Sequence, residues 1–406
     1  MSNKQLRSIK DLGNLDGKKV LVRSDFNVPL DGTKITDDGR IKASLPTIKT
    51  LLDANAQVVI CAHLGRPKGT PEEKYSLKPV AKRLSELSGV DVVMAKDTVG
   101  DSAKEATGNM KNGDIVLLEN LRFNAGETSK DEEERSEFAK QLASLADVYV
   151  SDGFGVVHRK QASVYDVAKL LPSAAGLLVE KEIVELSKVT ENPEHPYLVV
   201  LGGAKVSDKL NVIENLLPKA DTILIGGGMS YTFLKSQGYD IGTSLLEEDM
   251  IDTAKRIVNE SKEGGAKVVL PEDVVMAEEF DADAGAETAD VDALEKTKYG
   301  EKATGMDVGE KTSELFAKEI AKAKTIFWNG PLGVFEFKKF ANGTIALAKA
   351  IKESDAFSVI GGGDSASAVR NLGFADSDFG HISTGGGASL ELLEGKELPG
   401  IAVLQD

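Results

Sequence analysis

The chain has 406 residues, of which 41% are hydrophobic and 28% are charged, a composition typical of a globular protein. This length exceeds what one hydrophobic core usually supports, so we expect two domains. The net charge of −16 argues against nucleic acid and anionic membranes as partners, because the field of the protein repels polyphosphate surfaces. Any bound anion therefore requires a local basic pocket.

Targeting and redox features favour a reducing cytoplasm. No apolar run approaches the roughly 20 residues that span a bilayer, and the first residues lack the apolar core of a signal peptide. The single cysteine, Cys61, cannot form an internal disulfide. It shares a strand face with His63, but a buried structural thiol is favoured over a catalytic pair. The four histidines lack metal-ligand spacing, so no structural zinc site is expected.

The first half of the chain repeats one pattern, a short apolar run that ends in polar or charged residues. These runs are expected to be strands at 19–22, 58–62, 115–118 and 147–150. Helical patterns lie between them, such as 77–87 and 129–145, and Ser129 and Glu132 have the spacing of a capping box. Apolar strands that alternate with helices predict a parallel sheet covered on both faces.

Basic side chains follow these strands, and one follows a hairpin expected at 30–33. Ligands of parallel sheets bind beyond the carboxyl ends of the strands. A lone arginine there is usually solvated or paired, but several from separate strands of an acidic protein would converge into one basic cleft. Such a cleft suits a small anion with phosphate or carboxylate groups, which the guanidinium fork grips in bidentate fashion. The residues concerned are Arg23, Arg40, His63, Arg66, Arg122, His158 and Arg159.

The pattern changes after Pro172. An amphipathic helix is expected over 174–189, closed by Pro193 and Pro196, and we interpret it as the connector between two α/β halves. The boundary is placed near residue 188.

The second half repeats the strand-then-helix unit. Its expected strands are 198–201, 222–225, 267–270, 325–328, 357–360 and 380–383. Glycine triplets follow three of these strands, at 226–228, 361–363 and 385–387, and Asn329-Gly330-Pro331 follows a fourth. The acidic stretch 278–302 is expected to be a solvated surface excursion.

The stretch Gly202-Gly203-Ala204-Lys205-Val206-Ser207-Asp208-Lys209 follows a strand and leads into a helix. A strand that breaks at glycines and restarts as a helix leaves free N–H groups where the helix dipole favours negative charge. Lys205 and Lys209 add full positive charges. Alone, the stretch is equally consistent with an ordinary turn and solvated lysines. Together with the other glycine turns of the same half, it favours a nucleotide pocket.

A rival interpretation comes from Gly361-Gly362-Gly363-Asp364-Ser365-Ala366, which loosely matches the dinucleotide fingerprint of an NAD-dependent oxidoreductase. Asp364 would then place a carboxylate against the pyrophosphate. A Mg²⁺ ion would remove this conflict by bridging carboxylate and phosphates, which favours a magnesium nucleotide over NAD. The Walker A motif is absent from the sequence. A non-catalytic nucleotide-binding module is a further alternative.

Over essentially its full length the chain resembles the phosphoglycerate kinase family. The resemblance is carried by Arg23-Ser24-Asp25-Phe26-Asn27-Val28-Pro29, His63-Leu64-Gly65-Arg66-Pro67, Glu119-Asn120-Leu121-Arg122-Phe123, Gly202-Gly203-Ala204-Lys205-Val206, Asn329-Gly330-Pro331-Leu332-Gly333-Val334-Phe335-Glu336 and Gly361-Gly362-Gly363-Asp364. It implies two doubly wound parallel-sheet, Rossmann-like domains joined by a helical hinge. The implied N-terminal domain is 1–172 with the tail 394–406, the interdomain helix is 173–188, and the C-terminal domain is 189–393.

The resemblance also implies a reaction and its site residues. The reaction is reversible, Mg²⁺-dependent phosphoryl transfer between 1,3-bisphosphoglycerate and ADP, giving 3-phosphoglycerate and ATP in glycolysis, by a cytoplasmic monomer. The phosphoglycerate would be bound by Asp25, Phe26, Asn27, Arg40, His63, Leu64, Gly65, Arg66, Arg122 and Arg159. MgATP or MgADP would be bound by Gly203, Lys209, Gly227, Gly228, Gly305, Asn329, Glu336, Gly361, Gly362, Gly363, Asp364 and Ser365, with Asp364 on the metal. Arg40, Lys205 and Gly386 would be catalytic.

The chemistry agrees with this assignment. The acceptor carboxylate is already ionised at neutral pH, so no general base is needed and none stands out. In-line positioning and charge neutralisation remain, and lysine, arginine, Mg²⁺ and helix N-termini supply them. Because the reactants lie on different domains, the domains are expected to close about the connector. Gln161 stands where the family motif usually has histidine, which leaves its role and that of His158 open.

Overall fold

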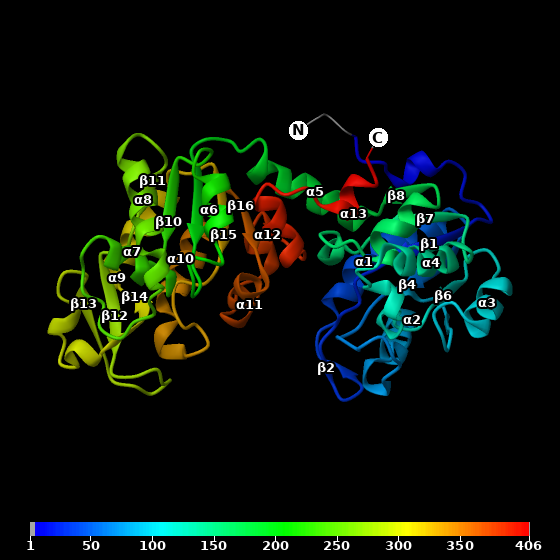
Figure 1. Ribbon diagram of the computed structural model, residues 1–406, viewed down its shortest axis with the longest axis horizontal. Helices are drawn as coiled ribbons and strands as arrows, with labels where there is room; N and C mark the ends of the chain where they lie inside the picture. The colour runs from blue at the N-terminus through cyan, green and yellow to red at the C-terminus, as the bar shows by residue number, and fades with distance from the viewer. Residues whose placement is uncertain (1–4, 406) are drawn as a thin grey trace. The chain divides into compact units, whose positions relative to one another are not determined.

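The computed structural model describes residues 5–405, and Figure 1 shows their helices and strands. The chain divides into two compact units: unit 1 is Met1–Ile183 with Glu397–Asp406, and unit 2 is Val184–Lys396. The division falls within helix α5 (Leu177–Thr190). Each unit is built around one six-stranded sheet whose strands all run parallel, which confirms the predicted fold class. Among residues 5–405, no helix is long and apolar enough to cross a membrane.

The sheet of unit 1 has the strand order β5-β6-β4-β1-β7-β8. In that order its strands are Val92–Met94, Ile115–Leu117, Gln57–Cys61, Lys19–Arg23, Val148–Ser151 and Ser173–Ala175. The four central strands are the predicted ones, whereas the short edge strands β5 and β8 were not predicted. The expected helix over 174–189 begins only at Leu177, because the preceding residues pair with β7.

Helices flank the sheet of unit 1. A short hairpin, β2–β3, lies between β1 and α1 in the chain. The helices are α1 (Gly39–Asp53), α2 (Lys78–Ser88), α3 (Asp101–Gly108), α4 (Glu132–Ala143) and α13 (Pro399–Ala402), and the hairpin strands are Leu30–Asp31 and Lys34–Ile35. The capping-box prediction at Ser129 was wrong. Asp131 caps α4 instead, and its carboxylate accepts from the N–H groups of Glu133 and Glu134. Ser129 donates its hydroxyl to Glu134.

The core of unit 1 lies between the sheet and these helices. Val22 and Ile60 of the central strands are fully buried, and they belong to one cluster with Ile41 of α1 and Val80 of α2. The central strands are apolar on both faces because both faces are covered. Polar residues are therefore concentrated just past the strand ends.

The main sheet of unit 2 has the order β11-β10-β9-β15-β16-β17. In that order its strands are Lys267–Val269, Thr222–Ile225, Tyr197–Leu201, Thr325–Asn329, Phe357–Gly361 and His381–Ile382, all at the predicted places. The helices are α6 (Leu210–Leu216), α7 (Met229–Ser236), α8 (Ile251–Lys262), α9 (Glu310–Ile320), α10 (Asn342–Glu353), α11 (Gly363–Asn371) and α12 (Gly387–Leu393). The buried Trp328 and Phe316 belong to its core.

A small antiparallel sheet completes unit 2. Its order is β13-β12-β14, with β12 at Asp273–Ala277, β13 at Ala286–Asp290 and β14 at Thr304–Val308. The prediction of a purely solvated stretch at 278–302 was therefore wrong in part. β13 pairs with β12 along its whole length, and Leu294 is buried. β13 was not predicted because it is an edge strand whose polar, mostly exposed residues lack the apolar pattern of a buried strand.

Candidate active site

The predicted basic residues of unit 1 meet at the carboxyl ends of β1 and β4. The strands pair in register with Arg23 opposite Cys61, so Arg23 ends β1 beside the start of the loop that carries His63. The Arg23 guanidinium donates to His63 Nδ1 at 3.1 Å, and both side chains are buried. Cys61 is buried, as predicted, and burial raises the pKa of its thiol to about 12.

Asp25 connects this cluster to helix α1. The Arg40 guanidinium, in the first turn of α1, donates to Asp25 Oδ2, and the N–H of Asn27 donates to Asp25 Oδ1 at 3.1 Å. Burial opposes ionisation of Asp25, but the neighbouring His63 and Arg40, the N–H of Asn27 and the charge of Arg23 hold the pKa of the carboxyl below its usual value. The Arg40 side chain is 40% exposed, so it can also bind an anion from solution.

Gly65 brings two further predicted residues together. Its N–H donates to Asn27 Oδ1 at 2.8 Å, and its carbonyl accepts from Arg122 at 2.7 Å. A Cβ atom at Gly65, where φ is +63°, would lie 2.3 Å from the ring of Tyr75, so only glycine fits. Burial and the charge of Arg23 lower the pKa of Arg122 to about 10. Crowded, partly desolvated cations of this kind favour an anionic ligand.

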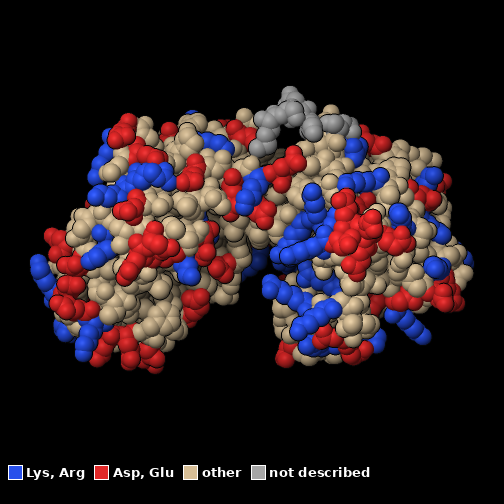
Figure 2. Space-filling view, in the orientation of Figure 1, with Lys and Arg blue, Asp and Glu red and all other residues tan. Residues whose placement is uncertain are grey.

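The remaining predicted residues of unit 1 lie around this cluster. Arg66 and Arg159 are exposed, and Arg159 donates to His158 Nε2 at 3.1 Å. Phe26 and Leu64 are buried in the core, and the backbone of Leu64 is hydrogen-bonded to the Asn120 side chain through both its N–H and its carbonyl. Lysine and arginine side chains gather on the side of unit 1 that carries α1 and β2 (Figure 2).

In unit 2, the loops after β9, β10 and β15 pack backbone against backbone. Gly203 donates to the carbonyl of Pro331 at 2.9 Å and accepts from Met229 at 3.0 Å. A Cβ atom at Gly202 would lie 2.2 Å from the Pro331 carbonyl, and one at Gly227 would lie 2.6 Å from the nitrogen of Gly203. These glycines are therefore required for the loops to meet.

Polar side chains join these loops to the loop after β16. Lys209 donates to Asn329 Oδ1, and the amide of Asn329 donates to the Gly361 carbonyl at 2.6 Å. The hydroxyl of the buried Ser365 accepts from the N–H of Gly330 at 2.7 Å. Burial lowers the pKa of Lys209, and the nearby Asp364 carboxylate opposes that shift.

Three predicted charged residues of unit 2 are exposed: Lys205, Glu336 and Asp364. None of these three side chains has a hydrogen bond or ion pair within residues 5–405. Gly228 precedes α7, and Gly386, with φ of +50°, precedes α12. Gly305 lies on β14 against the ring of Tyr231.

Several residues that shape these sites were not predicted. Glu247 accepts from the N–H groups of Val206 and Ser207, so it holds the loop that carries Lys205. It lies 41 positions from Val206, and no local signal in the sequence links the two. In unit 1, no local sequence signal links Arg23 to Ser163, to which it donates, or to Glu127, which accepts from Ser163.

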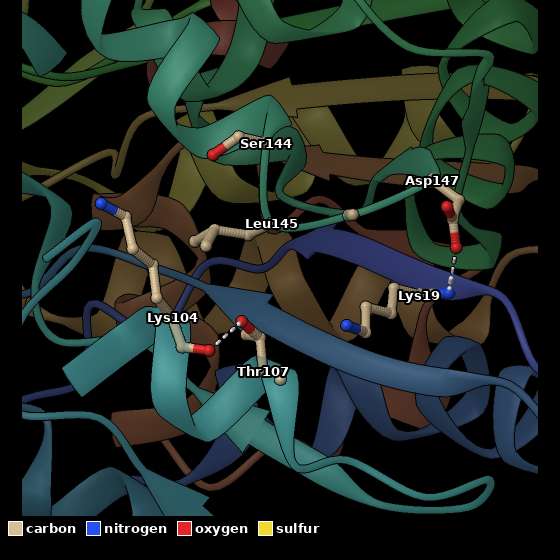
Figure 3. Close-up of a pocket in the computed structure, with 8 residues that line it drawn as sticks. Lys19, Lys104, Thr107, Ser144, Leu145 and Asp147 are labelled. Carbon is tan, nitrogen blue, oxygen red and sulfur yellow. Dashed lines mark hydrogen bonds between the residues drawn. The ribbon is translucent and has the colours of Figure 1, made fainter. Parts of the chain in front are cut away.

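A separate hollow lies at the other end of the strands of unit 1, where β1 and β7 begin (Figure 3). Its volume is about 380 Å³, and its lining includes Lys19, Lys104, Ser144 and Asp147. The N–H of Lys19 donates to Asp147 at 2.9 Å. Because this is where β1 begins, the strand-end residues described above lie elsewhere.

Comparison with known proteins identifies the family. The family model described as phosphoglycerate kinase matches residues 9–396. The phosphoglycerate kinase of Clavibacter michiganensis subsp. michiganensis is 59% identical over 98% of this chain and 99% of the relative, and that of Bifidobacterium longum (strain DJO10A) is 57% identical over 98% and 100%.

Two solved structures share the fold. The phosphoglycerate kinase of Coxiella burnetii has a TM-score of 0.88 at 41% identity and covers 98% of this chain and 99% of its own. That of Pyrococcus horikoshii OT3 has a TM-score of 0.83 at 35% identity, with 98% of each chain covered. With a matching family model and close relatives along nearly its whole length, the chain belongs to the phosphoglycerate kinase family, kinases of glycolysis that use a carboxyl group as phosphoryl acceptor.

Proposed function

We propose that unit 1 binds the phosphoglycerate and unit 2 binds the nucleotide in the reaction of this family. The chain is a kinase that transfers a phosphoryl group reversibly between 1,3-bisphosphoglycerate and ADP, giving 3-phosphoglycerate and ATP. One observation carries the division of labour. Around His63 in unit 1, three arginines face a single carboxylate, that of Asp25. Unit 2 instead presents glycine loops with exposed charged side chains beside them.

In unit 1, the ligand would be a small anion held by direct charge. Arg40 and Arg122 would grip its carboxylate and phosphate oxygens, with Arg66 and Arg159 at the exposed rim. Asp25 accepts from the Arg40 guanidinium and the Gly65 carbonyl accepts from the Arg122 guanidinium, so one side of each group is already fixed. The remaining N–H groups would bind the substrate without a large loss of side-chain entropy. Asn27 is also part of the proposed site, and its side-chain oxygen is held by the N–H of Gly65.

In unit 2, the glycine loops at 202–203, 226–228 and 361–363 would let the nucleotide approach the backbone closely. Lys209 would bind the nucleotide phosphates, and Glu336 the ribose. Lys205, on the loop held by Glu247, would neutralise the transferring phosphoryl group. The backbone N–H at Gly386 would add a donor where charge develops. No proton needs to be abstracted, because the acceptor is an ionised carboxylate.

Asp364 fits the magnesium ion that this chemistry requires. Mg²⁺ in phosphoryl-transfer sites usually takes one or two carboxylates and completes its shell with phosphates and water. An exposed carboxylate without a protein partner, close enough to influence Lys209, suits that arrangement. Within residues 5–405, no group of three or more potential ligand side chains forms a closed protein cage. When bound, the ion neutralises charge on the phosphate oxygens.

Further proposals follow from the same assignment. Phosphoryl transfer needs reacting atoms about 3–3.5 Å apart, so the phosphoglycerate and nucleotide domains must approach each other during turnover. We propose that 173–188 serves as the connector between domains 1–172, with the tail 394–406, and 189–393. We also propose that the enzyme acts as a monomer in the cytoplasm, where its single buried thiol stays reduced.

A coupled assay tests the function directly. MgATP-dependent phosphorylation of 3-phosphoglycerate is expected with purified protein, and removing Mg²⁺ with a chelator should abolish it. A folded, metal-replete sample without turnover would contradict the proposal. An NAD-dependent oxidoreductase or a non-catalytic nucleotide-binding module would bind a nucleotide without this turnover.

A further inference from the structure

A buried chain of polar groups lies behind the proposed phosphoglycerate site. Arg23, Glu127 and Ser163 are all completely buried. Arg23 Nε donates to the Ser163 hydroxyl at 2.8 Å, and that hydroxyl donates to Glu127 Oε1 at 2.7 Å. The backbone N–H of Ser163 donates to the other carboxylate oxygen at 3.0 Å. The chain crosses three separate elements: β1, η4 (Ala125–Glu127) and η6 (Ala162–Asp166).

The direction of these hydrogen bonds is fixed by chemistry. A guanidinium can only donate, so the Ser163 hydroxyl must accept from Arg23 and give its own hydrogen to Glu127. Burial raises the pKa of the Glu127 carboxyl, and the positive charge of Arg23, which lies beyond this hydroxyl, opposes that rise. Removing one of these two buried groups would leave the other without its partner, which strongly destabilises a fold. Glu127 and Ser163 therefore hold the guanidinium of Arg23 in one place.

The far end of the same guanidinium contacts His63. The Arg23 nitrogen can only donate to Nδ1 at 3.1 Å, so Nδ1 is unprotonated and the ring hydrogen sits on Nε2. Within residues 5–405, Nε2 has no hydrogen-bond partner, which leaves it available to a ligand. The charged groups that face His63 are Arg23, Asp25, Arg122 and Arg40. Burial, followed by the charge of Arg23, holds the pKa of His63 well below its ordinary value.

We propose that Glu127 and Ser163 are positioning residues that, through Arg23, present His63 to the substrate as a neutral Nε2–H donor. This inference rests on the proposed phosphoglycerate site of unit 1. A donor that keeps its hydrogen and does not titrate would bind the anionic substrate equally well across the neutral pH range. Neither positioning residue needs to touch the substrate.

The tautomer of His63 can be read from the ¹⁵N shifts of its ring, because the chain has only four histidines and His63→Gln assigns the signal. These spectra need no substrate, so they report on the network even if the proposed function fails. We expect the Nε2–H tautomer in the unmodified protein, with His63 titrating well below its ordinary range. An Nδ1–H tautomer, or a ring that titrates near pH 6.5, would overturn the proposal.

Two variants test the positioning role, and a third is the matched control. Ser163→Ala and Glu127→Gln should mix the tautomers and raise the KM for 3-phosphoglycerate by about 10-fold, while the KM for MgATP stays unchanged. Asp166→Asn removes another buried carboxylate of unit 1, the partner of Arg135, so it controls for lost stability. It should keep the tautomer and both KM values.

Rescue gives a second readout for the hydroxyl. Ser163→Thr retains the hydroxyl and should restore the tautomer and the KM if it folds; if it does not fold, Glu127→Gln alone decides. An altered tautomer with an unchanged KM for 3-phosphoglycerate would overturn the positioning role. So would a normal tautomer and KM in Ser163→Ala. Absence of turnover in the unmodified protein would instead contradict the proposed function.

Discussion

The two proposed sites are built from different materials. In unit 1, the proposed site is formed by polar and charged side chains: Arg23 and His63 are buried, and Arg122 donates to a backbone carbonyl. In unit 2, the corresponding positions past the strands are glycines, such as Gly202 and Gly227, whose backbones touch neighbouring loops. Three charged side chains proposed for the site of unit 2, Lys205, Glu336 and Asp364, are exposed.

The difference follows from the ligands. A small anion offers few atoms, so binding depends on charge–charge contacts that are strong only when partly desolvated. A nucleotide offers a long surface, so binding depends on how closely the backbone approaches it. We therefore expect side-chain truncation to be most damaging in unit 1 and an added Cβ atom to be most damaging in unit 2.

Arg40→Ala should have the largest effect on substrate binding. Removing one partner of a charge pair that becomes desolvated when the ligand binds costs about 2–5 kcal/mol, so affinity for 3-phosphoglycerate should fall by at least about 30-fold while MgADP affinity hardly changes. Calorimetric titration of each ligand measures both. Arg83→Ala is the control, because Arg83 is similarly exposed at 36% and also pairs with an aspartate. Equal losses for both ligands would show that the assignment of the two sites is wrong.

Gly227→Ala should be the next most damaging change. The left-handed φ of +65° costs an alanine about 1 kcal/mol, and the new Cβ atom would also collide with the backbone of Gly203. Gly238→Ala is the matched control, since its φ is +92° but no atom lies within 4 Å of the added Cβ. We expect thermal unfolding to show a larger loss for Gly227→Ala, together with weaker ADP binding. Equal losses would mean that strain alone, without loop contact, explains the glycine.

Asp364→Asn should leave the fold intact because the side chain is exposed and unpaired within residues 5–405. Nucleotide affinity should fall in the presence of Mg²⁺ and change little in its absence, by roughly 10-fold against less than about 2-fold. ADP titrations with and without Mg²⁺, in both proteins, measure this. A dinucleotide site without metal predicts the opposite, since losing the carboxylate would improve binding of a bare pyrophosphate.

The comparison also explains what the sequence could predict. Apolar runs such as Val58–Ile60 predicted the central strands because a strand buried on both faces has a distinctive composition. The edge strand Ser173–Ala175 has no such signature, and it forms because β7 offers it a partner. The start of α5 was misplaced for the same reason. Local pattern identifies elements that are stable by composition and misses those that depend on tertiary pairing.

The sites divide in a similar way. Strand-end cations could be predicted because topology alone gathers them at one edge of a sheet. The residues that hold them could not. Ser163 is 140 positions from Arg23, and Glu247 is 41 from Val206, so only the folded chain joins them. Individual roles such as that of Glu336 came from the family resemblance and await mutagenesis.

Two buried aspartates with raised pKa values, Asp152 in unit 1 and Asp307 in unit 2, sharpen the comparison further. Burial raises the pKa of Asp152 in unit 1 to about 8 and that of Asp307 in unit 2 to about 7. Asp152 Oδ2 has no hydrogen-bond partner, while Asp307 accepts from the N–H groups of Gly343 and Val308 at 2.8 and 2.9 Å. Only Oδ1 of Asp152 accepts, from the Thr47 hydroxyl and the N–H of Leu178, whereas both oxygens of Asp307 accept from backbone N–H groups. Burial makes both carboxyls costly to ionise.

Asp152→Asn should therefore change how stability depends on pH. The folded state holds the proton of Asp152 more tightly than the unfolded chain, so between about pH 4 and pH 8 unfolding releases a proton and stability falls as pH rises. The slope is at most about 1.4 kcal/mol per pH unit. The amide cannot ionise, so the variant should lose less stability than the unmodified protein between pH 5 and 8, measured by urea unfolding. Asp307→Asn, which puts an amide where two N–H groups need an acceptor, should instead destabilise at every pH. Parallel pH curves for Asp152→Asn and the unmodified protein would show that Asp152 keeps its ordinary ionisation inside the fold.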